Sequence, residues 1–124
     1  MILDEGVLFA IDRGDAAARA MLTAASRNGV ELHTTHPVLA QVWRTCPRQA
    51  RLAQLLKAIV IHPFDDGRAV GQLLSASGTS DVVDAHLVIM ATRLGVDVLT
   101  GDLDDISKLT EALGPAGPRV HSWP

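Results

Sequence analysis

Short apolar runs alternate along this chain with longer segments in which apolar residues recur at helical spacing. The short runs predict strands, and the longer segments predict helices. The predicted strands are residues 1–3, 31–34, 59–62, 96–100 and 119–121. The predicted helices are residues 15–28, 37–43, 47–58, 67–77, 81–94 and 103–113. Strands that alternate with helices in this way predict a layered α/β fold with a mostly parallel sheet.

Polar and helix-breaking residues mark several of the predicted boundaries. Ser80 is expected to cap the start of the helix over 81–94, and Gly95 to close its end. Asp15 is placed to cap the helix over 15–28. In open parallel sheets, binding sites form beyond the carboxyl ends of the strands, near a reversal of strand order. Residues that bind a ligand or carry out catalysis are therefore expected in the segments that follow the strands.

Length and charge narrow the classes of protein that the chain can represent. Its 124 residues fit a single domain, residues 1–124. The net charge of −3 gives no overall positive field that would attract nucleic acid. Cys46 is the only cysteine, which excludes an internal disulfide and agrees with a reducing cytosol. No signal peptide pattern or membrane-length apolar run is present, so a cytoplasmic protein with no membrane partner is expected.

Acidic residues occupy the positions where a site is expected. Asp4 directly follows the first predicted strand, and Asp102 lies just beyond the fourth, so both reach one edge if these strands are neighbours. Asp84 lies in a helix that is apolar on nearly every face, so we expect it to be buried. A buried carboxylate needs a partner such as a cation. Structural explanations also exist, because Asp102 can cap a helix with Asp105 three residues later, and Asp81 suits the helix dipole.

A divalent cation would relieve the repulsion between carboxylates gathered at one edge. Hard oxygen ligands suit Mg²⁺ or Mn²⁺, and the histidines and the cysteine show no zinc-site spacing. Magnesium that is held by a few carboxylates keeps water molecules, one of which can attack a phosphodiester. The acidic residues therefore indicate metal-dependent phosphodiester hydrolysis.

Four segments are similar, in order and at suitable spacing, to the sequence blocks of the PIN-domain family. Residues 2–10 (ILDEGVLFA) resemble its opening strand that ends in aspartate, and residues 35–43 (THPVLAQVW) resemble its second block. Residues 80–88 (SDVVDAHLV) match the third block, with its aspartate at Asp84. Residues 99–105 (LTGDLDD) match the fourth, Thr-x-Asp-x-Asp, with Asp102 and Asp104.

The resemblance implies a three-layer α/β/α sandwich and Mg²⁺- or Mn²⁺-dependent cleavage of single-stranded RNA. For short members of the VapC type, it also implies a toxin with a cognate antitoxin and, in many members, a homodimer. The implied catalytic metal ligands are Asp4, Asp84 and Asp102. Further candidate ligands are Glu5, Gln41, Asp81, Asp104 and Asp105.

The chain departs from the family pattern at two positions. Gln41 stands where the family carries a glutamate, and an amide oxygen ligates a cation more weakly and cannot act as a base. Glu5 stands where a threonine or serine is usual. One hypothesis is that Glu5 restores the missing charge, and the alternative is that it is a solvated acid of a first helical turn.

Basic and aromatic residues add less to the functional picture. Arg44, Arg48 and Arg51 lie three or four residues apart, which predicts one shared helical face. That face would either contact RNA phosphates beside the acidic site or be an ordinary solvated surface. Four aromatic residues without a tyrosine show no base-stacking platform.

Three functions remain open from the sequence. The first is a ribonuclease toxin that an antitoxin holds inactive. The second is a catalytically weakened or inactive PIN domain that binds RNA or antitoxin without cutting, which Gln41 favours. The third, more remote, is a receiver-like phospho-acceptor domain, suggested by Asp4 and Glu5 after the first strand.

Overall fold

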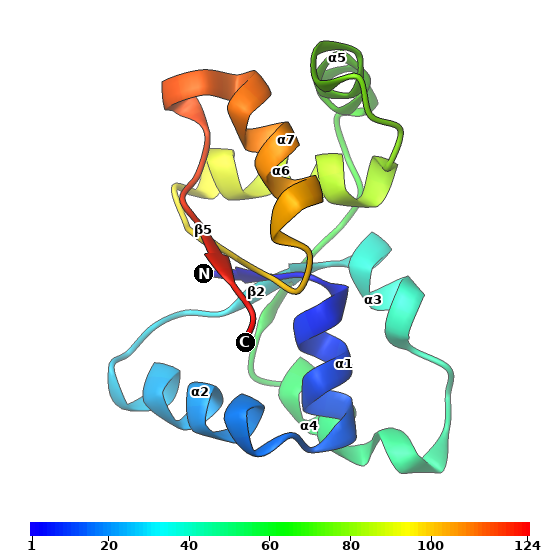
Figure 1. Ribbon diagram of the computed structural model, residues 1–124. Helices are drawn as coiled ribbons and strands as arrows, with labels where there is room; N and C mark the ends of the chain where they lie inside the picture. Colours follow the sequence, from blue (N-terminus) through cyan, green and yellow to red (C-terminus); the bar gives the residue numbers. More distant parts are fainter.

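The computed structural model describes residues 1–124, and its five strands form one parallel sheet (Figure 1). The strands are β1 (Ile2–Leu3), β2 (His33–Thr35), β3 (Val60–His62), β4 (Val98–Thr100) and β5 (Val120–Ser122). They are arranged in the order β3-β2-β1-β4-β5. All residues of β1, β2 and β4 are buried, as expected for a parallel sheet covered on both faces.

Seven α-helices and two short 3₁₀ helices surround this sheet. The α-helices are α1 (Glu5–Arg13), α2 (Ala16–Arg27), α3 (His36–Val42), α4 (Ala50–Leu56), α5 (Gly67–Ser77), α6 (Val82–Leu94) and α7 (Leu103–Leu113). The 3₁₀ helices are η1 (Pro47–Gln49) and η2 (Gly114–Ala116). In Figure 1, α1, α2 and α4 lie below the sheet, and α5, α6 and α7 lie above it. The predicted three-layer α/β/α sandwich is therefore confirmed. No helix has both the length and the apolarity that a membrane span requires.

The strand order reverses between β1 and β4. From β1 the chain builds outward to β2 and β3, and it then crosses back to pair β4 with the other side of β1. The registers Ile2 with Val98 and Leu3 with Leu99 bring the carboxyl ends of β1 and β4 side by side. A receiver-like domain places its third strand next to its first, whereas β3 lies at the edge here. The receiver-like alternative is therefore wrong.

Helix α1 was not among the predicted elements, although local signals for it exist. Asp4 caps its start, because a carboxylate oxygen accepts a hydrogen bond from the Val7 backbone N–H at 3.2 Å. Gly14, with φ at 74°, ends the helix, and its N–H donates to the last turn. Leu8 and Ile11 are buried on the side of α1 that faces the core.

Two other predictions need correction. Helix α6 is capped by Asp81, whose Oδ1 accepts from the Asp84 N–H at 3.0 Å, and not by Ser80. Asp15 stands at the N-cap position of α2, but its side chain accepts no capping hydrogen bond there. Gly95, with φ at 66°, closes α6 as predicted.

The first turn of α1 packs closely against the segment that follows β4. A Cβ atom added to Gly6 would lie 3.0 Å from the Cα of Gly101, which is tighter than most Cβ contacts in proteins. Only glycine at position 6 allows this approach without a shift of the backbone. The contact brings the segment after Asp4 next to the segment before Asp102.

Candidate metal centre

Asp4 ties the end of β1 to the end of β4. Its side chain is buried, and its Oδ1 accepts from the backbone N–H groups of Val7 and Gly101, each at 3.2 Å. Its Oδ2 accepts from the Thr100 hydroxyl and from the Gly101 N–H. Burial raises the pKa of Asp4, and these hydrogen bonds offset part of that rise. Protein donors therefore hold Asp4 in one orientation, and they occupy most of its lone pairs.

Asp84 is the most strongly perturbed acid in the protein. Its side chain is 6% exposed, which confirms the prediction that it is buried. Burial raises the pKa of Asp84 to about 7, and repulsion from nearby carboxylates adds to the effect. In decreasing order of effect, these are Glu5, Asp81, Asp4 and Asp102. We call these five residues (Asp4, Glu5, Asp81, Asp84 and Asp102) the acidic cluster.

Glu5 and Gln41 each carry a buried side-chain oxygen without a hydrogen-bond partner. Burial raises the pKa of Glu5, and the charges of Asp4, Asp81 and Asp102 add to this. Glu5 therefore belongs to the acidic cluster, which contradicts its interpretation as a solvated acid. Gln41 lies on α3, which packs against both α1 and α6. An unsatisfied buried oxygen costs free energy, so both oxygens would gain from a positive partner.

The remaining predicted acids are exposed, and two of them serve as helix caps. Asp102 begins α7 by accepting from the Asp105 N–H at 3.3 Å, and Asp81 caps α6 in the same manner. Asp105 also forms an ion pair with Lys108 at 3.7 Å. Together with Asp81 and Asp84 it lines a pocket of about 220 Å³. Asp104 is exposed and does not contribute to the raised pKa values of the cluster.

The chemistry of this donor set fits a hard divalent cation. All of its members would bind a metal through oxygen, which suits Mg²⁺ or Mn²⁺. Four carboxylates repel Asp84, and one buried oxygen each of Glu5 and Gln41 accepts no hydrogen bond. In this conformation no three acidic, histidine or cysteine side chains are placed so that one ion could contact all of them. Binding an ion therefore requires side chains to turn. The exposed Asp81 and Asp102 each use Oδ1 to cap a helix and keep Oδ2 for an ion.

Thr100 is a member of the site to which the sequence analysis gave no role. Its hydroxyl donates to Asp4 and accepts from the backbone N–H of Asp102 at 2.8 Å. It thus links the two acids that follow β1 and β4. The threonine that precedes Asp102 in the fourth sequence block was the available signal.

The three arginines do not share one helical face, so that prediction is wrong. Arg44 follows α3, and its guanidinium donates to the carbonyl groups of Ala40 and Trp43. Arg48 lies in η1, and Arg51 lies in α4. The guanidinium of Arg51 packs at Gly14, at the end of α1 opposite to the acidic cluster. No common phosphate-binding rim follows from these positions.

The structure is an all-parallel α/β/α sandwich with acids at the carboxyl ends of its central strands, which is a PIN-like fold. One solved structure with this fold is VapBC2 from Rickettsia felis bound to a DNA fragment from their promoter. The TM-score is 0.71 at 16% sequence identity, and the match covers 99% of this chain and 98% of that chain. The chain is therefore VapC-like in its fold, as the four sequence blocks indicated. No family model and no curated protein matches the sequence.

Proposed function

We propose that this protein is a VapC-type toxin, a Mg²⁺- or Mn²⁺-dependent endoribonuclease that cuts single-stranded RNA in the cytoplasm. The observation that carries the proposal is Asp84, a buried carboxylate whose pKa is raised by burial and by the charges of four other carboxylates. Such an arrangement destabilises a fold unless a cation completes it. The acidic cluster also lies at the reversal of strand order between β1 and β4, where α/β sheets commonly bind ligands.

The proposed partners come from two sources. The solved neighbour is a VapBC2 complex, and the whole-chain match supports a cognate antitoxin here as well. The RNA substrate and a homodimer follow from the resemblance of the four sequence blocks to the PIN-domain family. The acidic surface of the cluster would repel RNA phosphates in the absence of a cation, so substrate binding and metal binding are coupled.

Each residue has a definite part in this proposal. Asp4, Asp84 and Asp102 would hold the cation, which supplies a water nucleophile at neutral pH and neutralises charge on the phosphate. Thr100 and the Gly101 N–H orient Asp4 through hydrogen bonds that are already in place. Asp102 lies at the start of α7 and is exposed, so it faces the side from which substrate arrives.

Gln41 favours a second candidate function, that of a weakened or inactive PIN domain that binds RNA or antitoxin. Its Oε1 is buried without a donor, so it can ligate a cation. A neutral amide oxygen binds a cation more weakly than a carboxylate does and cannot accept the proton of an attacking water. Under this alternative the fold and the partners stay the same, and only cleavage is lost.

The deciding experiment measures cleavage of a mixed pool of single-stranded RNA in Mg²⁺ or Mn²⁺. The proteins compared are the parent, Gln41→Glu, Asp84→Asn and, as a matched control, Asp104→Asn. Cleavage by the parent and by Asp104→Asn, but not by Asp84→Asn, supports the ribonuclease. Cleavage by Gln41→Glu alone supports the weakened domain. If none of the folded proteins cuts the pool, the enzyme proposal fails.

A separate titration tests the part played by Glu5. Glu5→Gln removes one charge from the cluster and keeps the size of the side chain. We expect several-fold weaker binding of Mn²⁺ by isothermal titration calorimetry. Unchanged affinity would remove Glu5 from the metal site.

A further inference from the structure

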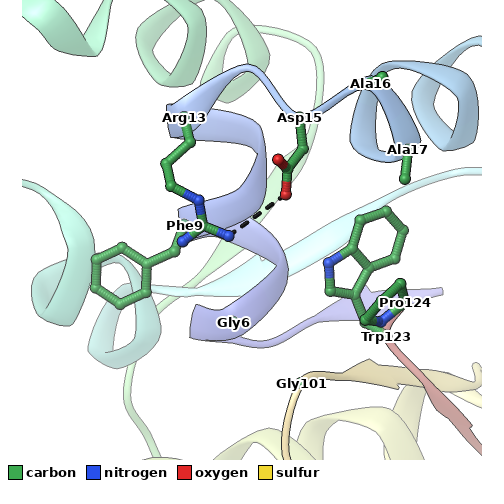
Figure 2. A pocket seen from close by; sticks show the side chains of 9 residues that line it. All are labelled: Gly6, Phe9, Arg13, Asp15, Ala16, Ala17, Gly101, Trp123 and Pro124. Carbon is green, nitrogen blue, oxygen red and sulfur yellow. Dashed lines mark hydrogen bonds and ion pairs between the residues drawn. The ribbon is translucent and has the colours of Figure 1, made fainter.

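A pocket of about 650 Å³ opens directly beside the acidic cluster (Figure 2). Helix α1 supplies Gly6, Phe9 and Arg13 to its lining, and Gly101 and Trp123 come from the segments after β4 and β5. Its volume lies in the range of about 300–1,000 Å³ that is typical of sites for small ligands. The pocket is therefore large enough for one nucleotide unit.

The pocket and the acidic cluster share a wall. Gly101 lines the pocket and donates its N–H to both oxygens of Asp4. Gly6 also lines it, and a Cβ atom at that position would lie 3.4 Å from Asp4 Oδ1. An RNA strand with one nucleotide in the pocket would therefore reach the acidic cluster within about the length of one further nucleotide.

The side chains that line the pocket suit a nucleobase and its phosphate. Both Phe9 and Trp123 line the pocket, and Figure 2 shows α1 between them, with the Phe9 ring pointing away from the Trp123 indole. Phe9 is 39% exposed, unusually accessible for a large aromatic side chain. Arg13 pairs only with Asp15, at 3.4 Å, and both side chains are exposed. An exposed pair of this kind is weak, so the Arg13 guanidinium can exchange Asp15 for a phosphate.

Trp123 is held in place by the sheet. Its backbone N–H donates to the Thr100 carbonyl at 2.6 Å, directly before Gly101. The indole of Trp123 is half-buried, with the small residues Ala16 and Ala17 also lining the pocket. A rigid aromatic ring next to an open cavity offers a stacking surface at little entropic cost.

We propose that this pocket is the subsite for the nucleobase next to the scissile phosphodiester of single-stranded RNA. The base stacks on Trp123, Phe9 offers a second aromatic surface to the base that follows along the strand, and Arg13 contacts a neighbouring phosphate. This assignment rests on the proposed cleavage of RNA at the acidic cluster. Two aromatic rings and a guanidinium favour a nucleotide over a peptide segment. The sequence showed no base-stacking platform, because its two components lie near opposite ends of the chain.

The test measures binding separately from cleavage. An Asp84→Asn background in Mg²⁺ prevents cutting, and fluorescence anisotropy of labelled uridylate and adenylate hexamers then gives Kd. We expect Phe9→Ala and Trp123→Ala to raise Kd about tenfold each, as for the loss of one base–aromatic stack. Phe64→Ala is the matched control, because Phe64 is an exposed aromatic residue outside the pocket and should leave Kd unchanged.

A second measurement keeps the pocket intact. In the same background, Trp43→Phe leaves Trp123 as the only tryptophan. Unlabelled hexamers should then quench its fluorescence with the Kd found by anisotropy. Quenching by the cognate antitoxin but not by RNA would make a peptide the occupant and overturn the proposal.

The outcomes separate this inference from the proposed function. If the parent cuts RNA while Phe9→Ala and Trp123→Ala bind like Phe64→Ala, the subsite is wrong and the ribonuclease stands. If RNA quenches Trp123 and the two variants bind weakly although the parent cuts nothing, the pocket binds a nucleobase, but its assignment beside a scissile phosphodiester falls together with the ribonuclease. An absence of hexamer binding and of quenching overturns the subsite.

Discussion

Replacement of Asp84 by asparagine should stabilise the metal-free protein at pH 8. Asp84→Asn keeps the size of the side chain and removes a charge that burial and four carboxylates disfavour. The pKa of Asp84 is about 7 in the fold and 3.8 without it. A difference of about three pH units, at about 1.4 kcal/mol each, sets an upper limit on the order of 4 kcal/mol.

The sign and the pH window follow from the direction of the pKa change. A carboxyl group with a raised pKa in the fold stays protonated there while the unfolded chain loses its proton. The stability of the parent therefore falls as the pH rises from about 4 to about 7, and it is constant above that range. The advantage of Asp84→Asn should thus be full at pH 8 and below about 1 kcal/mol at pH 4.

Thermal unfolding in EDTA, followed by circular dichroism at both pH values, measures this difference. For a domain of this size, 1 kcal/mol corresponds to roughly 3–5 °C in Tm, so the gain at pH 8 should be readily seen. Asp104→Asn is the control, because this exposed acid lies outside the cluster and its loss should change stability by less than about 0.5 kcal/mol. An equal Tm for Asp84→Asn and the parent at pH 8, or a gain that is the same at pH 4, would refute the reasoning.

Three further predictions concern the frame of the site. Gly6→Ala should destabilise the protein by at least about 1 kcal/mol in urea denaturation, because its Cβ meets backbone at 3.0 Å. Gly71→Ala, in an open part of α5, should instead stabilise it by about 0.5–1 kcal/mol, and equal effects would contradict the close approach at Gly6. Thr100→Val leaves buried Asp4 without its hydroxyl donor and should cost about 1–3 kcal/mol by the same assay. Gln41→Glu adds a negative charge beside the acidic cluster, so it should lower Tm in EDTA and raise Mn²⁺ affinity about tenfold by calorimetry. A higher Tm in EDTA would show that position 41 does not feel the charges of the acidic cluster.

Local signals predicted those elements whose ends are chemically marked. Helices α5 and α7 have the predicted boundaries, because Gly78 ends the first and Asp102 caps the second. Helix α1 escaped prediction although Asp4 and Gly14 flank it, since a nine-residue segment directly after a strand has a short apolar pattern that suits either element. The prediction that the three arginines share one helical face was wrong, because Pro47 starts a new helical turn between Arg44 and Arg48.

The candidate site could be predicted in part. The positions of Asp4 and Asp102 after strands, and the burial of Asp84 in an apolar helix, follow from periodicity and spacing. The place of Glu5 in the cluster does not, because a first-turn acid points to solvent or to its neighbours according to what packs against the helix. The hydrogen bond from Thr100 to Asp4 likewise depends on which strand lies beside β1.

The sequence by itself determined the alternation of strands and helices, the α/β class and the acids at the carboxyl ends of strands. These features depend on residues that are close in sequence, so the spacing of apolar and polar residues along the chain reveals them directly. Only the tertiary structure decided the strand order β3-β2-β1-β4-β5. With it came the hydrogen bond from Thr100 to Asp4 and a pocket that both Phe9 and Trp123 line. Contacts between segments so distant in the chain depend on how whole layers pack, and no local pattern of residues encodes that choice.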